Sequence, residues 1–325
     1  MEKRDNHPRE MQLNYFRRIS DQLLTSDYCL KQGRRSRKFL CLFSLLSLLQ
    51  QACTDINKHP YCSNLNYLCP MFIDTHTHLY LDEFTADRDE CVRNALDAGV
   101  GRMLLPNIDS ASWQPMLDLA GLYPGICLPM AGIHPTSVLP ETIEQELTLL
   151  AQQLERGTFA AIGEIGIDLY WDKTHQALQE EIFLYQVRLA KKLGLPIVIH
   201  VRKSFDEVWR ILKPETGPGL KGVFHCFPGD LPQARKVIEA GFMLGIGGVV
   251  TFKNSGLQQV VTVVGPEHIV LETDSPFLAP VPYRGKRNEP GYIPIIAGKV
   301  AELCGVSINE VAEITTWNAE KLFNL

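Results

Sequence analysis

Eight short apolar runs, separated by segments with helical periodicity, constrain the fold of this chain more than any other feature of its sequence. The runs are residues 71–79, 102–106, 128–134, 160–164, 196–200, 222–225, 242–247 and 269–274. Helical segments at 85–98, 144–155, 176–193 and 230–241 carry the start and stop signals of helices, an oxygen side chain or proline at the entry or glycine at the exit. Alternating strands and helices are typical of a parallel sheet, and eight such units between residues 71 and 325 predict a closed (β/α)8 barrel.

A doubly wound open sheet is the alternative arrangement of parallel strands and helices. Such sheets normally have a glycine-rich phosphate turn after the first strand, whereas this chain has His76 and His78 at that place. The barrel is therefore the predicted fold. Barrels of this size are single domains, so the length of the stretch requires no second domain.

His76 and His78 stand two residues apart in the segment Asp74-Thr75-His76-Thr77-His78. Because a β-strand directs alternate side chains to one face, we expect Asp74, His76 and His78 to point the same way. Two imidazoles and a carboxylate on one face are costly to bury unless a cation lies between them. The pattern indicates a divalent metal site, although a chance pair of histidines on a solvated strand would look the same.

Four further runs end in a residue type that binds metals. These residues are Glu164, His200, His225 and Asp274. Active sites of barrels form at the carboxyl ends of the strands, so ligands that are distant in sequence meet there. Together with His76 and His78 they exceed the needs of one four-coordinate ion and suit two ions bridged by a carboxylate. Imidazole and oxygen ligands without thiolate admit Mg, Mn or Zn.

The residues around these positions resemble the motifs of the TatD family of metal-dependent deoxyribonucleases, which belongs to the amidohydrolase-like barrels. The motifs are Asp74-x-His76-x-His78, Gly163-Glu164-Ile165-Gly166-Ile167-Asp168, Ile199-His200-x-Arg202, His225-Cys226-Phe227-x-Gly229, Glu272-Thr273-Asp274-Ser275-Pro276-Phe277-Leu278 and Arg284-Gly285-Lys286-Arg287-Asn288-Glu289-Pro290. The resemblance covers the chain from about Phe72 to the C-terminus. Leu169-Tyr170-Trp171 departs from the sequences of relatives, which affects substrate contacts more than the metal core.

The resemblance also implies how the ligands are shared and which reaction they serve. One ion would be held by His76, His78 and Asp274, a second by His200 and His225, and Glu164 would bridge the two. Glu164 and Asp274 would be the catalytic carboxylates, with Asp274 accepting the proton of the attacking water. The expected activity is that of an exodeoxyribonuclease with DNA as its substrate. We expect a monomer without an obligate protein partner and without a membrane.

One histidine and several cationic side chains are candidates for substrate contacts. They are His134, Arg202, Lys253, Arg284, Lys286 and Arg287. His134 matches the family's Gly-x-His-Pro, which favours a substrate contact over a structural role. The cationic side chains at 284–287 follow the eighth apolar run, which places them at the end of the barrel where the site is expected. We therefore favour phosphate binding for these side chains over simple exposure to solvent. Glu272 stands two residues before Asp274, so we expect both side chains on the same face of the strand. Glu272 would either orient a ligand histidine or be a buried structural residue.

Two other functions remain open from the residues alone. The same metal site could hydrolyse an ester or amide, such as an aminoacyl-tRNA ester, and the cationic cluster fits that substrate too. A non-catalytic binding protein is disfavoured because every expected ligand is present. The net charge of the whole chain is −5, so no broad basic face indicates nucleic acid, yet a nuclease that grips only a short strand end needs none.

The first seventy residues differ in composition from the rest of the chain. Residues 1–70 carry 11 Lys and Arg against 6 Asp and Glu, a net charge of +5, whereas the remainder carries 21 against 31, a net of −10. A basic run at 34–38 precedes an apolar run at 39–49, which resembles an export signal but is too short for a membrane span and far from the N-terminus. We therefore expect 1–70 to be an extension or a misplaced start, and 71–325 to be the barrel. Because the barrel's four cysteines show no paired spacing, a reducing cytoplasm is the expected location.

Overall fold

The computed structural model of this 325-residue chain describes residues 72–171 and 173–325. The expectations for residues 1–70 fall outside the described residues and stay predictions. Each of the eight apolar runs contributes one β-strand. The strands are β1 (Phe72–Asp74), β2 (Val100–Pro106), β3 (Cys127–Met130), β4 (Ile162–Asp168), β5 (Ile197–Arg202), β6 (Gly222–Phe224), β7 (Met243–Ile246) and β8 (Ile269–Leu271).

All neighbouring strands pair in parallel, in the orders β1-β2-β3 and β4-β5-β6-β7-β8. Backbone hydrogen bonds join the two groups at both seams. Between β3 and β4, the Ala131 N–H donates to Ala161 O at 3.0 Å and the Gly163 N–H donates to Ala131 O at 2.8 Å. Between β1 and β8, the Thr75 N–H donates to Leu271 O at 3.0 Å. The eight strands thus close into a ring, and the predicted (β/α)8 barrel is confirmed.

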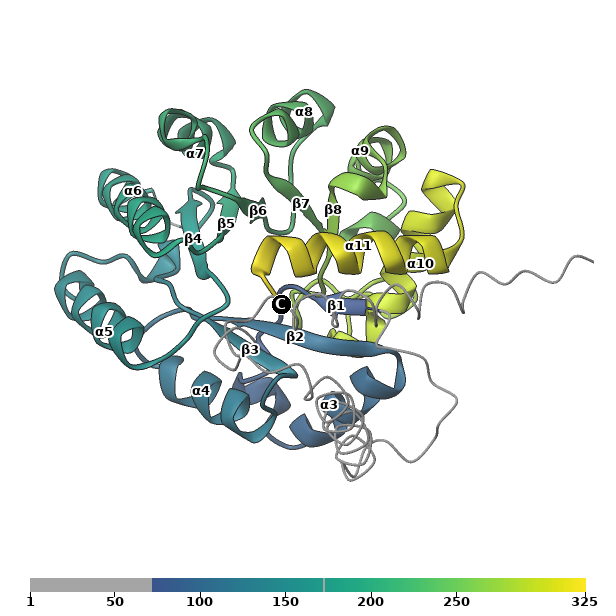
Figure 1. The fold of residues 1–325 in the computed structure, drawn as a ribbon, viewed down its shortest axis with the longest axis horizontal. Helices are drawn as coiled ribbons and strands as arrows, with labels where there is room; N and C mark the ends of the chain where they lie inside the picture. Colours follow the sequence, from purple (N-terminus) through teal and green to yellow (C-terminus); the bar gives the residue numbers. More distant parts are fainter. Residues whose placement is uncertain (1–71, 172) are drawn as a thin grey trace, which may run out of the picture. The chain divides into compact units, whose positions relative to one another are not determined.

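The described helices surround the strands in chain order, except the last, which lies across one end of them (Figure 1). They are α3 (Arg88–Asp97), α4 (Trp113–Leu122), α5 (Ile143–Arg156), α6 (Gln176–Leu193), α7 (Phe205–Leu212), α8 (Leu231–Glu239), α9 (Leu257–Val264), α10 (Ile293–Cys304) and α11 (Ile308–Phe323). Their ends follow the signals in the sequence, since Asp230 forms a capping box at α8 and Gly194 ends α6 in the left-handed conformation. Within the described ranges, no helix alone is long and apolar enough for a membrane span, and only α10 with its preceding turn and α11, bent by 109°, pass that test as a pair.

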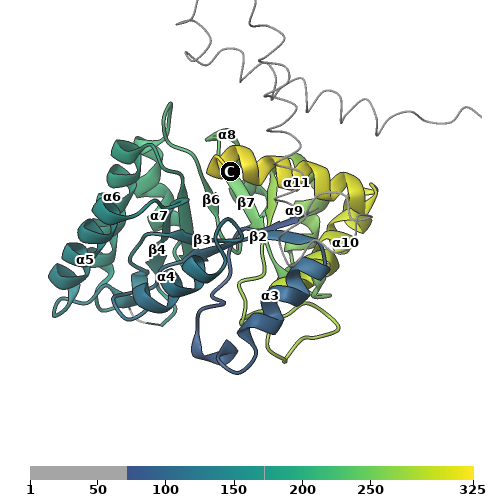
Figure 2. The same cartoon turned by 60° about the horizontal axis from the view of Figure 1, so that its bottom comes forward.

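The interior of the barrel is a layer of apolar side chains at the amino ends of the strands. The buried members are Ile73, Leu104, Met130, Ala161, Val198, Val223 and Val270, joined by Ala319, Leu322 and Phe323 of α11. Helix α11 lies across this end of the strands (Figure 2), where Asn318 donates to the carbonyl of Ile269 at 2.8 Å. The amino end is therefore filled and covered, which leaves the carboxyl ends of the strands for a site.

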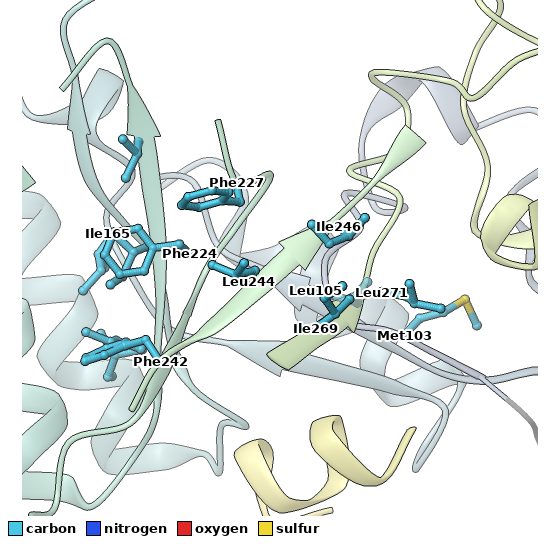
Figure 3. Close-up of a cluster of buried hydrophobic side chains, with 14 of the residues drawn as sticks. Met103, Leu105, Ile165, Phe224, Phe227, Phe242, Leu244, Ile246, Ile269 and Leu271 are labelled. Atoms are coloured by element: carbon cyan, nitrogen blue, oxygen red, sulfur yellow. The ribbon is translucent and has the colours of Figure 1, made fainter. Parts of the chain in front are cut away.

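Alternate residues of the same strands face outwards against the helices. Leu104 belongs to the inner layer, whereas its neighbours Met103 and Leu105 belong to the layer between strands and helices. Figure 3 shows this outer layer, including Ile269 and Leu271 of β8. The same alternation predicts that, in the residues just beyond β8, every second side chain points into the mouth of the barrel.

Candidate metal centre

The loop after β1 carries the first two histidines. Strand β1 ends at Asp74, so the prediction that Asp74, His76 and His78 share one strand face is wrong. The chain leaves the sheet there, and the Asp74 carboxylate turns to β8, accepting the Thr273 N–H at 2.9 Å and the Thr273 hydroxyl at 2.5 Å. His76 and His78 do meet, with their Nε2 atoms 3.3 Å apart.

Glu164 lies at the centre of the cluster, and its two carboxylate oxygens face different histidines. Oε2 is 3.1 Å from His76 Nε2 and 3.7 Å from His78 Nε2. Oε1 is 2.6 Å from His200 Nδ1 and 3.8 Å from His225 Nε2. Glu164 was expected at the end of its strand, but β4 continues to Asp168, so this carboxylate rises from within the barrel wall.

Asp274 completes the cluster from the loop after β8. Its Oδ1 lies 3.8 Å from His76 Nε2, 3.6 Å from His78 Nε2 and 3.7 Å from His225 Nε2. Its side chain is 14% exposed, whereas that of Glu164 is 3% exposed. The six predicted metal ligands therefore converge on one place, and Asp274 is the carboxylate nearer the solvent.

Burial sets the protonation of three of these imidazoles. It lowers the pKa of His76 and His225, and it lowers the pKa of His78 well below the usual value. All three rings are consequently neutral at neutral pH and keep a lone pair on one nitrogen. A neutral imidazole is the form that binds a metal ion.

The carboxylates respond in opposite directions. Burial raises the pKa of Asp274 to about 7, because the nearby His225 offsets only part of the loss of water and the negative charges of Glu164 and Glu272 add to it. Burial also disfavours the charge of Glu164, but the surrounding His134, His76 and His225 outweigh it and hold the pKa of Glu164 well below its usual range. Glu164 is thus ionised throughout the neutral range, as a bridging ligand must be.

A hydrogen-bonded chain fixes which nitrogen His78 offers. The Tyr80 hydroxyl lies 2.9 Å from His78 Nδ1 and donates to the carbonyl of Pro106 at 2.6 Å. With its hydrogen committed to Pro106, the hydroxyl oxygen can only accept from Nδ1–H. The lone pair of His78 is therefore on Nε2, which faces Glu164 and Asp274.

Asp168 does the same for His200. Its Oδ2 lies 3.0 Å from His200 Nε2, which leaves Nδ1 directed at Glu164. Burial lowers the pKa of His200, but the hydrogen bonds to Asp168 and Glu164 outweigh it and raise the pKa to about 9. The sequence alone assigns no role to Asp168, although Asp168 follows Glu164 in the same motif. Carboxylates that orient a ligand histidine in this way are common in metal sites.

Gly166 allows β4 and β5 to approach closely at this point. It pairs with His200 across the two strands, and a Cβ at Gly166 would collide with the His200 carbonyl. Glycine is required there because the strand also has a φ of 151°, which other residues rarely adopt. The close approach brings Glu164 and His200 together.

Glu272 contacts the fourth histidine. Its Oε1 lies 3.1 Å from His225 Nδ1 and accepts the N–H of Cys226 at 2.5 Å. Burial raises the pKa of Glu272 to about 7. His225 Nδ1 nevertheless has no hydrogen-bond partner among the described residues, so both expectations for Glu272 stay predictions.

The donor atoms fit divalent metal ions. His76, His78 and Glu164 offer ligand atoms within 4.8 Å of one another, and so do His134, Glu164 and His200. The rings of His76, His78 and His225 are neutral, and His200 would lose its proton on binding a metal. Four imidazoles around two buried carboxylates without a thiolate suit hard or borderline dications. Among the described side chains, His76 Nδ1 is buried without a hydrogen-bond partner, so this ring is not fixed by a structural network of its own.

His134 differs from His78 in its tautomer. Its Nδ1 accepts the N–H of Thr136 at 3.2 Å, so a neutral ring carries its hydrogen on Nε2. That Nε2 lies 3.3 Å from His200 Nδ1 and 3.5 Å from Glu164 Oε1. A donor at the edge of the cluster agrees with the expected substrate contact better than with metal ligation.

The predicted cationic contacts divide into two groups. Arg202, Lys253, Arg284 and Lys286 are exposed. Arg287 is not free, because its guanidinium donates to both carboxylate oxygens of Asp87, at 2.8 and 2.6 Å, and to Glu289 at 3.0 Å. These contacts indicate a structural ion pair in place of the expected phosphate contact, and they were invisible in the sequence because Asp87 lies 200 residues away.

Comparisons with known proteins agree with this geometry. Residues 73–324 match the model of the family described as TatD related DNase. The chain is 37% identical over 256 residues to the uncharacterized metal-dependent hydrolase YabD of Bacillus subtilis, which covers 78% of this chain and 100% of that protein. It is 34% identical over 259 residues to the 3'-5' ssDNA/RNA exonuclease TatD of Erwinia tasmaniensis, covering 78% and 99%.

A solved structure is similar over the same region. The TatD homologue YjjV of Escherichia coli superposes with a TM-score of 0.74 at 30% sequence identity, covering 79% of this chain and 100% of that one. The family match spans nearly all of the barrel, including every residue of the cluster. This protein therefore belongs to the TatD-related family and is a metal-dependent hydrolase.

Proposed function

We propose that this protein hydrolyses phosphodiester bonds of nucleic acids at a centre of two divalent ions bridged by Glu164. One observation carries the proposal: the two oxygens of Glu164 face separate groups of imidazole nitrogens, Oε2 towards His76 and His78, and Oε1 towards His200. A carboxylate serving one ion would need only one such group. Two-metal sites of this kind are used for displacement at phosphorus.

The residues divide between the ions as follows. His76, His78 and Asp274 would hold one ion, His200 and His225 the other, and Glu164 both. When bound, such ions polarise the phosphoryl group and lower the pKa of water from ~15.7 towards ~7. Mg, Mn and Zn all suit these ligands.

Asp274 is the proton acceptor in this proposal. Its carboxylate is the more exposed of the two in the cluster, so substrate and water reach it before they reach Glu164. An acceptor must lie within hydrogen-bond reach of the water that it deprotonates. His134 Nε2–H would donate to a non-bridging phosphoryl oxygen, so His134 would position the substrate.

Nucleic acid is the proposed substrate because of the relatives and the cations around the site. Two Erwinia relatives are described as 3'-5' ssDNA/RNA exonucleases at 33% and 34% identity. Arg202, Lys253, Arg284 and Lys286 are exposed on loops or strand ends at the carboxyl side of the barrel. Arg287 is omitted from these contacts because Asp87 and Glu289 occupy it.

The test is metal-restored turnover on defined substrates. Protein stripped with a chelator and supplied with Mg, Mn or Zn should release mononucleotides from end-labelled single-stranded DNA, and the stripped protein should not. An aminoacyl-tRNA is offered in parallel under the same conditions. Release of the amino acid without release of nucleotides would replace the nuclease proposal with an ester hydrolase.

A further inference from the structure

Two aromatic side chains stand exposed next to the metal centre. Tyr170 and Trp171 follow β4, and their side chains are 48% and 67% exposed. Trp113, by contrast, is 4% exposed, as is usual for an indole in a folded protein. The indole of Trp171 is too exposed to stabilise the fold by burial in the core. Its position therefore requires another explanation.

The carboxylate of Asp168 connects this pair to the centre. Its Oδ1 accepts the backbone N–H of Tyr170 at 2.8 Å and of Trp171 at 3.1 Å, while its Oδ2 faces His200 Nε2. The same side chain therefore orients a ligand histidine and fixes the backbone of both aromatic residues. The backbone of the pair is therefore hydrogen-bonded to a residue that also contacts the cluster.

Two cations accompany the aromatic pair. The Arg202 guanidinium lies 4.2 Å from the Tyr170 ring centre and 5.1 Å from the Trp171 ring centre, and Lys203 Nζ lies 4.9 Å from that of Tyr170. Arg202 is two residues beyond His200 on β5, so strand alternation directs it to the same face as the ligand. Both cations cover Tyr170, which leaves Trp171 as the more accessible ring.

The mouth of the barrel is unusually apolar for a surface. Among the described residues, six of the twelve exposed large apolar side chains lie on loops after strand carboxyl ends: Leu139, Tyr170, Trp171, Phe277, Leu278 and Val281. The other six are spread over the outer helices. An exposed apolar surface concentrated beside a charged centre marks a binding site.

We propose that Trp171 stacks on a base of a single-stranded nucleic acid while Arg202 and Lys203 bind the adjacent phosphate. This inference rests on the proposed nuclease function and adds the subsite that selects an unpaired strand end. Aromatic rings flanked by cations are how proteins bind single strands without sequence preference, because every base has a face that can stack. A paired base keeps its faces covered by its neighbours, so a blunt duplex cannot occupy Trp171 without fraying.

The test compares Trp171→Ala with Trp171→Phe and with Trp317→Ala. Trp317 is a matched control, since it is 56% exposed and carries Lys321 at 4.7 Å from its ring but lies on α11 at the amino end of the barrel. Binding is measured on the metal-loaded protein with a phosphorothioate-capped oligonucleotide that resists cleavage. Turnover is measured on methyl p-nitrophenyl phosphate, a phosphodiester without a base.

We expect Trp171→Ala to weaken oligonucleotide binding about 5- to 140-fold, the effect of losing one stacked base. Trp171→Phe should recover most of the affinity, and Trp317→Ala should bind as the unchanged protein does. Turnover of the small diester should be unchanged in Trp317→Ala, and in the two Trp171 variants it should fall far less than oligonucleotide binding does. An oligonucleotide with abasic residues at its end should bind weakly to the unchanged protein and lose nothing further with Trp171→Ala.

The outcomes separate this inference from the proposed function. Equal affinity of Trp171→Ala and the unchanged protein for the intact oligonucleotide overturns the stacking subsite and leaves the nuclease proposal standing. Equal loss on intact and abasic strands also overturns it, because the indole would then act without a base. Absence of diester turnover in the unchanged metal-loaded protein contradicts the proposed function, and the binding comparison still decides the role of Trp171.

Discussion

Thr273 holds the carboxylate of Asp74 with both its backbone N–H and its hydroxyl, at 2.9 and 2.5 Å, across 199 residues of sequence. The two residues join the end of β1 to the loop after β8. His76 and Asp274 flank this contact, and the Asp274 N–H donates to the His76 carbonyl at 2.9 Å. The seam that closes the barrel therefore sets the relative position of two proposed metal ligands.

Thr273→Val should weaken metal binding and stability together. Valine keeps the shape of threonine but removes the hydroxyl donor, leaving the buried Asp74 carboxylate with one fewer partner. Burial raises the pKa of Asp74 to about 7, so above that pH the carboxylate is charged and a lost hydrogen bond to it costs about 1.5–3 kcal/mol. Denaturant unfolding and metal titration check both effects, with Thr273→Ser as the control that restores the hydroxyl. Unchanged unfolding by the valine variant would mean that the contact is dispensable.

Asp168→Ala should lower metal affinity although Asp168 is not itself a proposed ligand. Without the carboxylate, nothing holds the proton on His200 Nε2, so the ring is free to present the wrong nitrogen. Loss of such a partner typically costs about 10- to 100-fold in metal affinity or activity. The measurement is a metal titration of the purified variant. Glu215→Ala, which removes an ion pair with Arg188 and Lys191 on the outside, should leave the affinity unchanged.

Arg287→Ala should lower thermal stability without weakening nucleic-acid binding. The guanidinium donates to Asp87, Glu289 and the Glu83 carbonyl. Its loss therefore removes the hydrogen bonds that connect the segment before α3 with the segment before α10. Asp87→Ala should lower the melting temperature by a similar amount, and the double variant should add little to either. Oligonucleotide binding that falls in Arg287→Ala but not in Asp87→Ala would restore the phosphate contact predicted from the sequence.

Metal binding should release protons, and more of them at pH 6 than at pH 8. The pKa of Asp274 is raised to about 7 by burial, and that of His200 to about 9 by hydrogen bonds to Asp168 and Glu164 that outweigh burial. Both groups are largely protonated at pH 6, whereas only His200 is at pH 8, and a metal ligand must lose its proton. Affinity should accordingly rise with pH. Calorimetric titration in two buffers with different ionisation enthalpies counts the protons, and no release at pH 6 would contradict these assignments.

The fold was predictable because its signals are local. Each apolar run between 102 and 274 became a strand, and Asp230 begins α8 and Gly194 ends α6 as expected. All six predicted ligands converge, since their places after or within strands of one barrel bring them together. The reason given for His76 and His78 was nevertheless wrong, because β1 is only three residues long and ends before them.

The features of the site that could not be predicted from the sequence depend on contacts between distant segments. The Asp74 carboxylate is bound by Thr273 and by the backbone N–H of His76, and Arg287 is occupied because Asp87 lies beside it. Neither Thr273 nor Asp87 can be identified by spacing. Asp168 was overlooked because nothing distinguishes an orienting carboxylate from a solvated one until His200 is seen 3.0 Å away. The expected contacts of His134, Arg202, Lys253, Arg284 and Lys286 with substrate stay predictions.

Metal content and turnover of Glu164→Gln beside Asp274→Asn test the bridging role of Glu164 most directly. The unchanged protein should hold two divalent ions per chain by elemental analysis. Glu164→Gln removes the negative charge that faces both histidine groups, so it should lose bound metal and activity together. Asp274→Asn should retain more metal, since an amide oxygen can still bind an ion, yet lose about 10²–10⁴ in rate because it cannot accept a proton. Near-normal metal content and turnover in Glu164→Gln would contradict the bridged two-ion centre.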